Sequence, residues 1–302
     1  MAKGNDAFGR IKYVQSANAL FHFMKKWDYL KSALNNRGLV PRYCKEDISY
    51  LGIKDGNDDY VNEIGVLEKC FCDIPLHEFN KSFPIKIKDG VISEEDREDV
   101  KSYNTHPGFY GNYAIAFEKS WCEENDCQPV YYLNTKSITV KNLRTFINKQ
   151  LQEGRIDNIG EDLALRLSLV KPLKGEMART LKWGSTVEFE KNYHDEKEWR
   201  YVMRSDSLKD LNIDRIIRIN SEDELESRNN ELYDDKYKKI WLNFKYIDIR
   251  YLIVPGKVER NECIEYILQL PDNLFEDGAD VARQKSLLIS KILVLEDIEE
   301  DC

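Results

Sequence analysis

The sequence predicts a mixed α+β fold, with mostly antiparallel sheets and flanking helices, in one domain spanning residues 1–302. Strand-like and helix-like patterns follow one another without the regular βαβ rhythm of a doubly wound parallel sheet. No internal repeat and no Gly/Ser-rich or Pro-rich linker divides the chain. A weak subdivision is expected only at its least regular stretch, residues 172–184. With 302 residues, 42% of them hydrophobic, the chain can bury a sizeable core.

The first expected elements are a strand, a helix and a second strand. The apolar run 19–23 predicts the first strand, and the helical pattern over 27–37 is followed by Gly38 as its expected C-terminal cap. The alternating run 66–74 predicts the second strand. The charged stretch 81–107, which contains the letters SEEDRED, is typical of a long surface loop.

Beyond residue 107, the period of the apolar residues separates helices from strands. Strands are expected at residues 113–117, 129–133, 199–203, 216–219, 240–244 and 251–254. Helices are expected at residues 119–125, 140–151, 163–170 and 258–270. A final apolar run covers residues 287–295.

Charge and hydrophobicity exclude several classes of protein. The chain has 54 acidic against 45 basic residues, a net charge of -9, which disfavours indiscriminate nucleic-acid binding but allows a local basic groove. No apolar run of about 20 residues predicts a membrane span. The N-terminal letters MAKGNDAFGR lack the apolar core of a signal peptide, so we expect a cytoplasmic protein.

The seven cysteines are odd in number and scattered, which is typical of a reducing compartment. Cys70 and Cys72 lie near His77, and Cys122 and Cys127 form a second group. Structural zinc sites usually combine two close pairs with two to four residues inside each. The run LEKCFCDIP fits a half-buried strand better, with cysteines as small hydrophobic residues. No metal site is therefore expected.

The chain contains no glycine-rich phosphate loop, no HExxH helix and no GxSxG nucleophile motif. Polar residues in or beside apolar strands remain as candidates. His22 lies within ALFHFM, where it is either a satisfied core histidine or a group that holds a ligand hydroxyl. Arg42 follows Pro41 and offers a planar fork to a phosphate or carboxylate; a surface ion pair is the alternative.

A third candidate lies in the letters HDEKEWRYVMR. Period-two alternation places Glu196, Glu198 and Arg200 on one face of a strand and Trp199 on the other. A carboxylate at a sheet edge is usually solvated. One beside an apolar wall is the kind of group that catalysis uses.

Four segments together resemble one known family. They begin SANALFHFMKKW, KCFCDIPL, YGNYAIAF and EKEWRYV, and their layout is similar to that of AbiGi-like proteins, most strongly over residues 16–134. These are bacterial proteins associated with abortive phage infection. In the system that gives the family its name, this component is called the antitoxin of a toxin–antitoxin pair. The resemblance therefore implies antiviral defence and a partner toxin.

A more distant resemblance implies chemistry. The opening strand, helix and following GL are similar to the start of ADP-ribosyltransferase folds of the DarT and PARP kinds, which implies NAD as substrate. On this resemblance His22 holds a ribose hydroxyl and Arg42 meets the pyrophosphate. Tyr110 or Tyr113 packs against the nicotinamide, and Glu198 is the catalytic carboxylate.

The sequence departs from that pattern at Met24, where those folds carry threonine. Two functions stay open: an NAD-using effector that transfers ADP-ribose to a nucleic-acid or protein acceptor or hydrolyses NAD, and a non-enzymatic antitoxin or sensor. In the second, the SEEDRED stretch and the acidic end LEDIEEDC neutralise a basic partner. A metal-dependent nuclease ranks last, because no acidic motif shows metal-ligand spacing.

Overall fold

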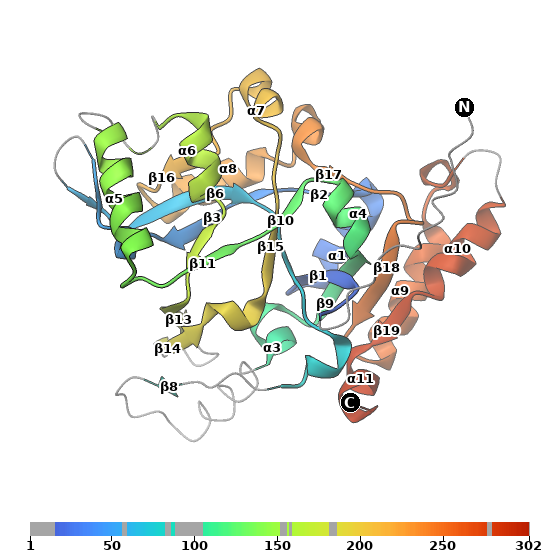
Figure 1. The fold of residues 1–302 in the computed structure, drawn as a ribbon. Coiled ribbons are helices and arrows are strands. Elements are labelled where there is room, and N and C mark those ends of the chain that lie inside the picture. The colour runs from blue at the N-terminus through green and yellow to red at the C-terminus, as the bar shows by residue number, and fades with distance from the viewer. Residues whose placement is uncertain are drawn as a thin grey trace, which may run out of the picture.

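The computed structural model describes residues 16–55, 59–81, 86–87, 105–151, 156, 159–180, 186–276 and 280–301. It confirms the predicted α+β class with mostly antiparallel sheets (Figure 1). Within the described residues the largest sheet has seven strands, and all its pairings except β18–β19 are antiparallel. In spatial order they are β10 (Cys127–Pro129), β15 (Glu198–Tyr201), β7 (Cys70–Cys72), β1 (Ala19–Met24), β9 (Tyr113–Glu118), β18 (Ile249–Val254) and β19 (Ile292–Val294).

Period-two alternation along β1 separates the two faces of this sheet. Leu20 and Met24 are buried in the core beneath α1 (Trp27–Asn36), α9 (Lys257–Gln269) and α10 (Val281–Ile289). Phe21 belongs to a smaller core on the opposite face, with residues of η2 (Leu76–Glu78) and α11 (Leu295–Asp301) around it. Because its residue number is even, His22 shares the α1 face with Leu20 and Met24.

A second sheet lies beside the first and is formed by β16 (Ile216–Arg218), β6 (Glu63–Glu68) and β3 (Arg42–Asp47). One face packs on α5 (Ile138–Gln150) and α6 (Glu161–Leu167), and the other on α7 (Ser205–Leu211) and α8 (Glu222–Glu231). Lys69 alone separates β6 from β7, so the two sheets are joined at that residue.

The remaining elements are short. They are β2 (Gly38–Leu39) paired with β17 (Leu242–Asn243), β4 (Ile53–Lys54) with β5 (Tyr60–Val61), β11 (Tyr131–Leu133) with β12 (Val170–Pro172), and a three-stranded sheet of β13 (Lys174–Thr180), β14 (Thr186–Asn192) and β8 (Lys86–Ile87). The other helices are α3 (His106–Tyr110), α4 (Lys119–Glu124), and the 3-10 helices η1 (Ser49–Leu51), η4 (Tyr193–Glu196), η5 (Asp235–Ile240) and η6 (Asp272–Leu274).

Several expected boundaries are corrected. The helix over 27–37 ends at Asn36, and Arg37, with a φ of 48°, takes the left-handed cap position expected of Gly38. The expected strand 66–74 is two strands, β6 and β7, and residues 240–244 form the end of η5 and then β17. Most of the expected loop 81–107 lies outside the described residues. The stretch 172–184 contains β13 and also lies partly outside them.

None of the helices in the described residues has both the length and the apolar composition needed to cross a bilayer.

Candidate functional site

The central sheet opens between β1 and β7. On one side β1 pairs with β9 from Ala19 to Met24, but its ladder with β7 consists of the single pair Phe21–Cys72. Next along β1, the side chain of His22 replaces the backbone ladder: its Nδ1 lies 2.8 Å from the carbonyl oxygen of Cys70. A carbonyl oxygen only accepts hydrogen bonds, so Nδ1 carries the proton and Nε2 is the acceptor.

His22 is neutral at physiological pH. Its burial, together with the nearby charge of Lys69, lowers the pKa of the imidazole to about 3, although the bond to Cys70 acts in the opposite direction. An unprotonated Nε2 can accept a hydrogen bond from a hydroxyl group. This chemistry fits the predicted contact with a ribose hydroxyl.

Two cavities meet at this opening. The first, here called the cationic cavity, has a volume of about 250 Å³, lies against α1, and has Arg42 and Lys69 among its lining residues. The second, the carboxylate cavity, has a volume of about 310 Å³, and its lining residues include the apolar Phe21 and several carboxylates. Residues lining both are His22, Phe23, Cys44, Glu68, Cys70 and Tyr110. The cavities are therefore neighbouring parts of one site.

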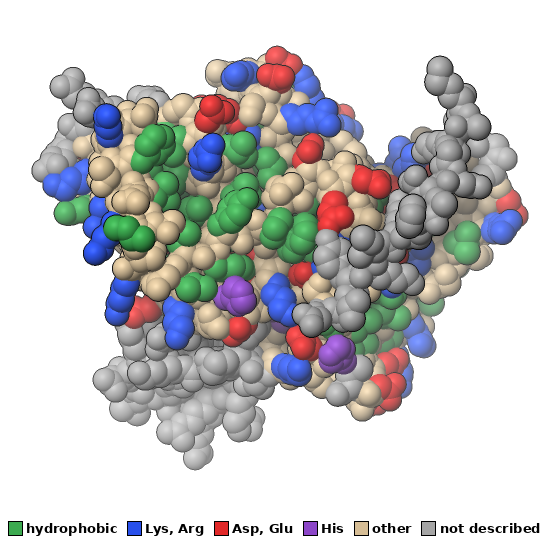
Figure 2. Space-filling view, in the orientation of Figure 1, with side chains coloured by type: hydrophobic (Ala, Val, Ile, Leu, Met, Phe, Trp, Pro, Cys, Tyr) green, Lys and Arg blue, Asp and Glu red, His purple; other side chains and the backbone are tan. Residues whose placement is uncertain are grey.

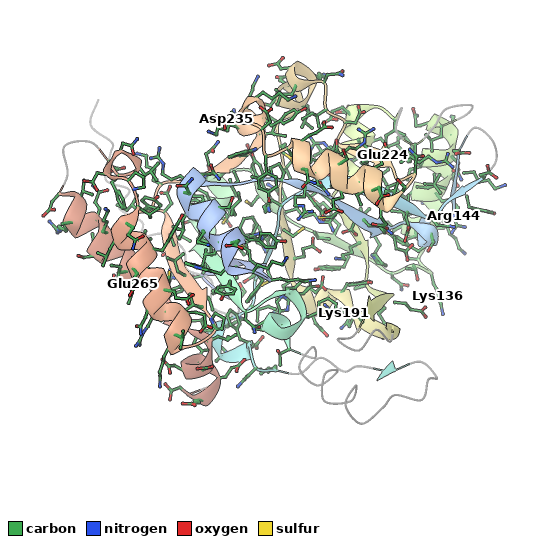
Figure 3. All side chains as sticks on the ribbon, turned by 180° about the vertical axis from the view of Figure 1, so that it is seen from behind. Lys136, Arg144, Lys191, Glu224, Asp235 and Glu265 are labelled. Atoms are coloured by element: carbon green, nitrogen blue, oxygen red, sulfur yellow. The ribbon has the colours of Figure 1, made fainter. Side chains whose placement is uncertain are left out.

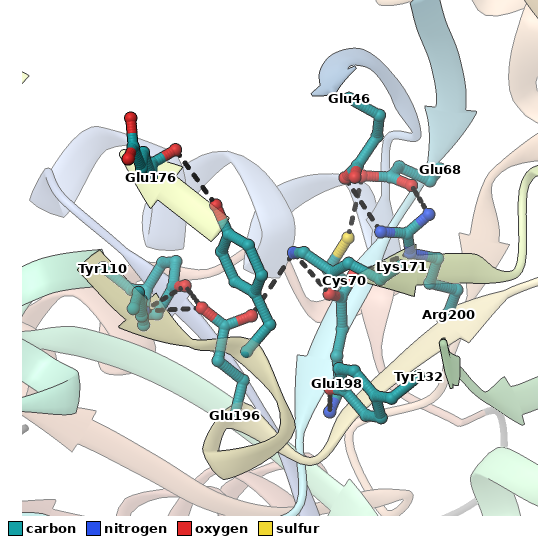
Figure 4. A network of polar contacts seen from close by, with 12 residues as sticks. Glu46, Glu68, Cys70, Tyr110, Tyr132, Lys171, Glu176, Glu196, Glu198 and Arg200 are labelled. Atoms are coloured by element: carbon teal, nitrogen blue, oxygen red, sulfur yellow. Dashed lines mark hydrogen bonds and ion pairs between the residues drawn. The ribbon is translucent and has the colours of Figure 1, made fainter. Parts of the chain in front are cut away.

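Glu198, on β15, lines the carboxylate cavity and has both carboxylate oxygens paired (Figure 4). Oε1 accepts from Arg200 Nε at 2.7 Å, and Oε2 accepts from Lys171 Nζ at 2.8 Å. Burial alone would raise the pKa of Glu198, but Arg200 and Lys171 outweigh it and hold this pKa well below its usual range. Arg200 and Lys171 thus favour the ionised form of Glu198. It is suited to stabilise positive charge and unsuited to donate a proton.

Glu196 forms a second charged group on the same cavity. It accepts a hydrogen bond from the Tyr110 hydroxyl and lies 2.5 Å from Lys191 Nζ and 3.3 Å from Lys171 Nζ. Burial raises its pKa, but the two lysines outweigh burial and lower it. Burial, with Glu196 beside it, raises the pKa of Tyr110 far above the usual value, so this hydroxyl remains a donor.

Gly111 fixes the position of Tyr110. Its φ of 133° is a conformation that other residues rarely adopt, and a Cβ there would lie 2.1 Å from the backbone oxygen of Met24. The absence of a side chain lets α3 end directly against the end of β1. Tyr110 therefore reaches the opening between β1 and β7.

Arg200 connects Glu198 with the second sheet. Its side chain is 2% exposed and also binds Glu46 at 2.8 Å, Glu68 at 2.9 Å and the carbonyl oxygen of Ser168 at 2.7 Å. Glu68, Cys70 and Glu198 offer ligand atoms within 4.8 Å of one another, a spacing compatible with a metal ion. The guanidinium of Arg200 lies among these carboxylates and opposes a second cation there.

The structure brings most of the predicted site residues together. His22, Tyr110 and Glu198 line the carboxylate cavity, and Arg42 lines the adjoining cationic cavity. Tyr113 is different: it stacks on Trp27 at 5.9 Å between ring centroids, within the core beneath α1 and α9, and lines neither cavity.

The predicted strand face is partly corrected. Glu198 and Arg200 share one face of β15, as the alternation indicates, and Trp199 packs on the opposite core. Glu196, however, ends η4 and lies outside the strand. It reaches the same cavity because the chain bends at Lys197, whose φ is 43°.

Sequence reasoning missed the basic partners of the site, Lys69, Lys171 and Lys191. The first two lie within short strand-like segments, where a charged residue among apolar ones is the only sequence signal that could have pointed to them.

The basic residues on and near α5 lie away from this site. Figure 3 shows Lys191 near α3, and Lys136 and Arg144 at the α5 end of the molecule. Arg144 supports the fold, since its Nε donates to the carbonyl oxygen of Leu51 at 2.6 Å.

The fold and site define an α+β protein with a highly charged pocket at an opening in its antiparallel sheet. The sequence profile of the AbiGi family, described as abortive phage resistance protein AbiGi, antitoxin, matches residues 98–255. The abortive phage resistance protein AbiGi of Lactococcus lactis subsp. cremoris is 32% identical over 276 residues, which cover 87% of this chain and 98% of the relative. The chain belongs to the AbiGi family. No solved structure matches it.

Proposed function

We propose that this chain is an anti-phage effector that binds NAD at the opening between β1 and β7 and breaks the nicotinamide–ribose bond. The observation that carries the proposal is the position of the ionised Glu198 on the carboxylate cavity, which His22 and Tyr110 also line. The name of the Lactococcus relative, an abortive phage resistance protein, supports the anti-phage role.

The ionised state of Glu198 suits this reaction. As the bond breaks, its electron pair leaves with the nicotinamide nitrogen, and positive charge develops on the ribose. An anionic carboxylate in a buried site stabilises that charge, because little water is present to screen it. Each oxygen of Glu198 accepts one bond from Arg200 or Lys171 and retains a lone pair for a ribose hydroxyl.

The second half of the reaction needs an acceptor. A nucleophilic oxygen or nitrogen forms a new bond to the ribose carbon and releases one proton. If water is the acceptor, the products are ADP-ribose and nicotinamide. If a nucleic-acid base or a protein side chain is the acceptor, the product is an ADP-ribosylated macromolecule.

The lining residues match the parts of NAD. The aromatic rings of Phe23, His106 and Tyr110 line the carboxylate cavity in contact with one another, and they suit the nicotinamide ring. His22 Nε2 accepts from a ribose hydroxyl, and Arg42 in the cationic cavity binds the pyrophosphate.

The test is to incubate the purified wild type and Glu198→Gln with labelled NAD, alone and with cell extract, DNA or RNA. The proposal predicts that the wild type releases nicotinamide and that Glu198→Gln is slower. Glu161→Gln is the matched control, because Glu161 pairs with the buried Arg215 at 2.6 Å outside both cavities. If the wild type protects cells from phage but never consumes NAD, the proposal is wrong.

A second candidate function is that of a non-enzymatic antitoxin, which the description of the family profile favours. Figure 2 shows hydrophobic side chains on the face that carries α5 and α6. Among the described residues there, Tyr131 is 63% exposed, Ile138 68% and Phe146 50%. Exposed apolar residues of this kind are typical of protein-binding surfaces. The acidic α11 offers a separate surface to a basic partner.

The two functions differ in what removes protection. An antitoxin neutralises the product of a neighbouring toxin gene, so it would co-purify with that toxin. It would also lose neutralisation on Phe146→Ser and keep it on Glu198→Gln. The effector proposal predicts that Glu198→Gln loses protection from phage and that Phe146→Ser keeps it.

A further inference from the structure

The cationic cavity has an excess of positive charge. Lys25, Arg42 and Lys69 line it, against one carboxylate, Glu68, among its described lining residues. Glu68 already lies 2.9 Å from Arg200 Nη1. Within the part of the chain that the structure describes, neither Arg42 nor Lys69 forms an ion pair with a carboxylate. Among the described residues, these two cations therefore have no carboxylate within ion-pair distance.

Lys69 is held in place by its backbone. It is the single residue between β6 and β7, and its carbonyl oxygen accepts from the Tyr201 amide at 2.9 Å. Alternation places its side chain on the face of Phe71 and His22, where its charge acts on the His22 imidazole. The side chain is half-buried, and burial lowers the pKa of Lys69 to about 8, with Arg42 acting in the same direction.

Taking a cation even partly out of water without an ion-pair partner costs free energy, so a half-buried lysine kept there calls for an anion. Arg42 supplies a planar fork that matches two phosphate oxygens, and Lys69 supplies a compact charge. Tyr29 and Ser32 of α1 line the same cavity and offer hydroxyl groups. A volume of about 250 Å³ admits two linked phosphate groups.

We propose that Lys69 and Arg42 together bind the diphosphate group of a nucleotide in the cationic cavity. This inference rests on the proposed function, since it assigns the phosphate-binding part of the same site. Lys69 is the new element, and it lies next to the residue that holds the ribose. The diphosphate would then orient the sugar toward the carboxylate cavity.

The experiment is calorimetric titration of the full chain with inorganic pyrophosphate, ADP-ribose and adenosine. Removing one charge-assisted contact, as in Lys69→Gln, should weaken binding of pyrophosphate and ADP-ribose about 10- to 100-fold. Lys69→Arg should retain more affinity than Lys69→Gln. Lys209→Gln is the control, because Lys209 lines a separate cavity, and it should bind like the wild type.

Thermal unfolding separates binding from folding. Lys69→Gln removes a half-buried charge that has no ion-pair partner among the described residues, so its melting temperature should equal or exceed that of the wild type. A lower melting temperature with unchanged pyrophosphate affinity would show a structural role and overturn the inference.

The NAD assay distinguishes this inference from the proposed function. If Lys69→Gln cleaves NAD with an unchanged KM, the diphosphate inference is wrong and the NAD function stands. If pyrophosphate binds in a Lys69-dependent manner but NAD is never cleaved, the inference stands and the proposed reaction is wrong.

Discussion

His22 Nδ1 lies 2.8 Å from the carbonyl oxygen of Cys70, directly beyond the single residue pair that joins β1 to β7. The imidazole thus takes the place of a backbone contact at the edge of an opening in the sheet. The same contact defines the tautomer, with Nε2 as acceptor. One residue therefore links the architecture of the opening to the contact proposed for the ribose.

Replacing His22 by asparagine separates these two roles. The Asn Nδ2 can still donate to Cys70, so the free energy of unfolding should change by about 1 kcal/mol or less. The Nε2 acceptor is lost, and NAD consumption should fall about tenfold. The measurements are denaturant unfolding and initial rates. Full activity in a folded His22→Asn protein would contradict the ribose contact.

Arg200 is predicted to be a main structural support of the site. Arg200→Met leaves the buried carboxylates of Glu68 and Glu198, and the partly buried one of Glu46, without their shared cation. Breaking a buried pair in this way costs about 3–5 kcal/mol of stability.

Urea unfolding measures this loss. The control is Arg228→Ala, which removes an exposed pair with Glu224 at 3.0 Å and should change stability by about 0.5 kcal/mol or less. Equal effects of the two substitutions would show that the buried network does not hold the sheets together.

Two histidines should make the fold sensitive to acid. Burial lowers the pKa of both His22 and His106 to about 3, whereas both are near 6.5 in the unfolded chain. Between these values the unfolded state binds more protons. As pH falls from 6.5 to 3, each histidine should therefore lower the free energy of unfolding by up to about 1.4 kcal/mol per pH unit.

Comparing the wild type with a variant that lacks both histidines separates their contribution to the acid sensitivity from that of the carboxylates. A His22→Gln/His106→Gln double variant should show a flatter decline of unfolding free energy over that window than the wild type. Parallel curves would mean that the histidines are protonated or solvated in the fold.

Pyrophosphate binding should weaken as pH rises through about 8. The bound anion favours the protonated form of Lys69, whose pKa is about 8, so affinity should fall up to about tenfold per unit above that pH. Lys69→Gln should abolish most of this dependence. The other titratable residues that line the cavity are His22, Lys25, Tyr29, Arg42, Cys44, Glu68, Cys70, Tyr110 and Tyr233.

Three of those neighbours do not reproduce the dependence near pH 8. His22 titrates near 3, and burial raises the pKa of the Cys44 and Cys70 thiols far above the usual value. Burial also raises the pKa of Glu68, and its ionisation would repel the anion in the same direction. If Lys69→Gln keeps the full pH dependence of pyrophosphate binding, that dependence comes from Glu68 and not from Lys69.

Local patterns predicted the elements better than the site. The run ALFHFM predicted β1 because its neighbours are apolar, and the alternation in EKEWRY placed Glu198 and Arg200 on one face of β15. The polar α8 was missed. It buries only Leu225 and Asn229 along its ten residues, so it carries almost no apolar period.

Long-range partners could not be predicted. Lys171 pairs with Glu196 and Glu198, and Arg200 with Glu46, across separations that no local spacing encodes. Tyr113, the alternative to Tyr110 for the contact with the nicotinamide, lies away from both cavities. Although Tyr113 follows Tyr110 by only three residues, it packs on Trp27 in the core, because Gly111 turns the chain between α3 and β9.

The most direct test of the account is the rate of nicotinamide release from NAD by the wild type and by Glu198→Gln, each shown to be folded by its unfolding transition. The account predicts measurable release by the wild type and a rate about 10²- to 10³-fold lower for Glu198→Gln, as expected when one preorganised stabilising group is lost. Equal rates in the two folded proteins, or no release by a wild type that protects cells from phage, would contradict it.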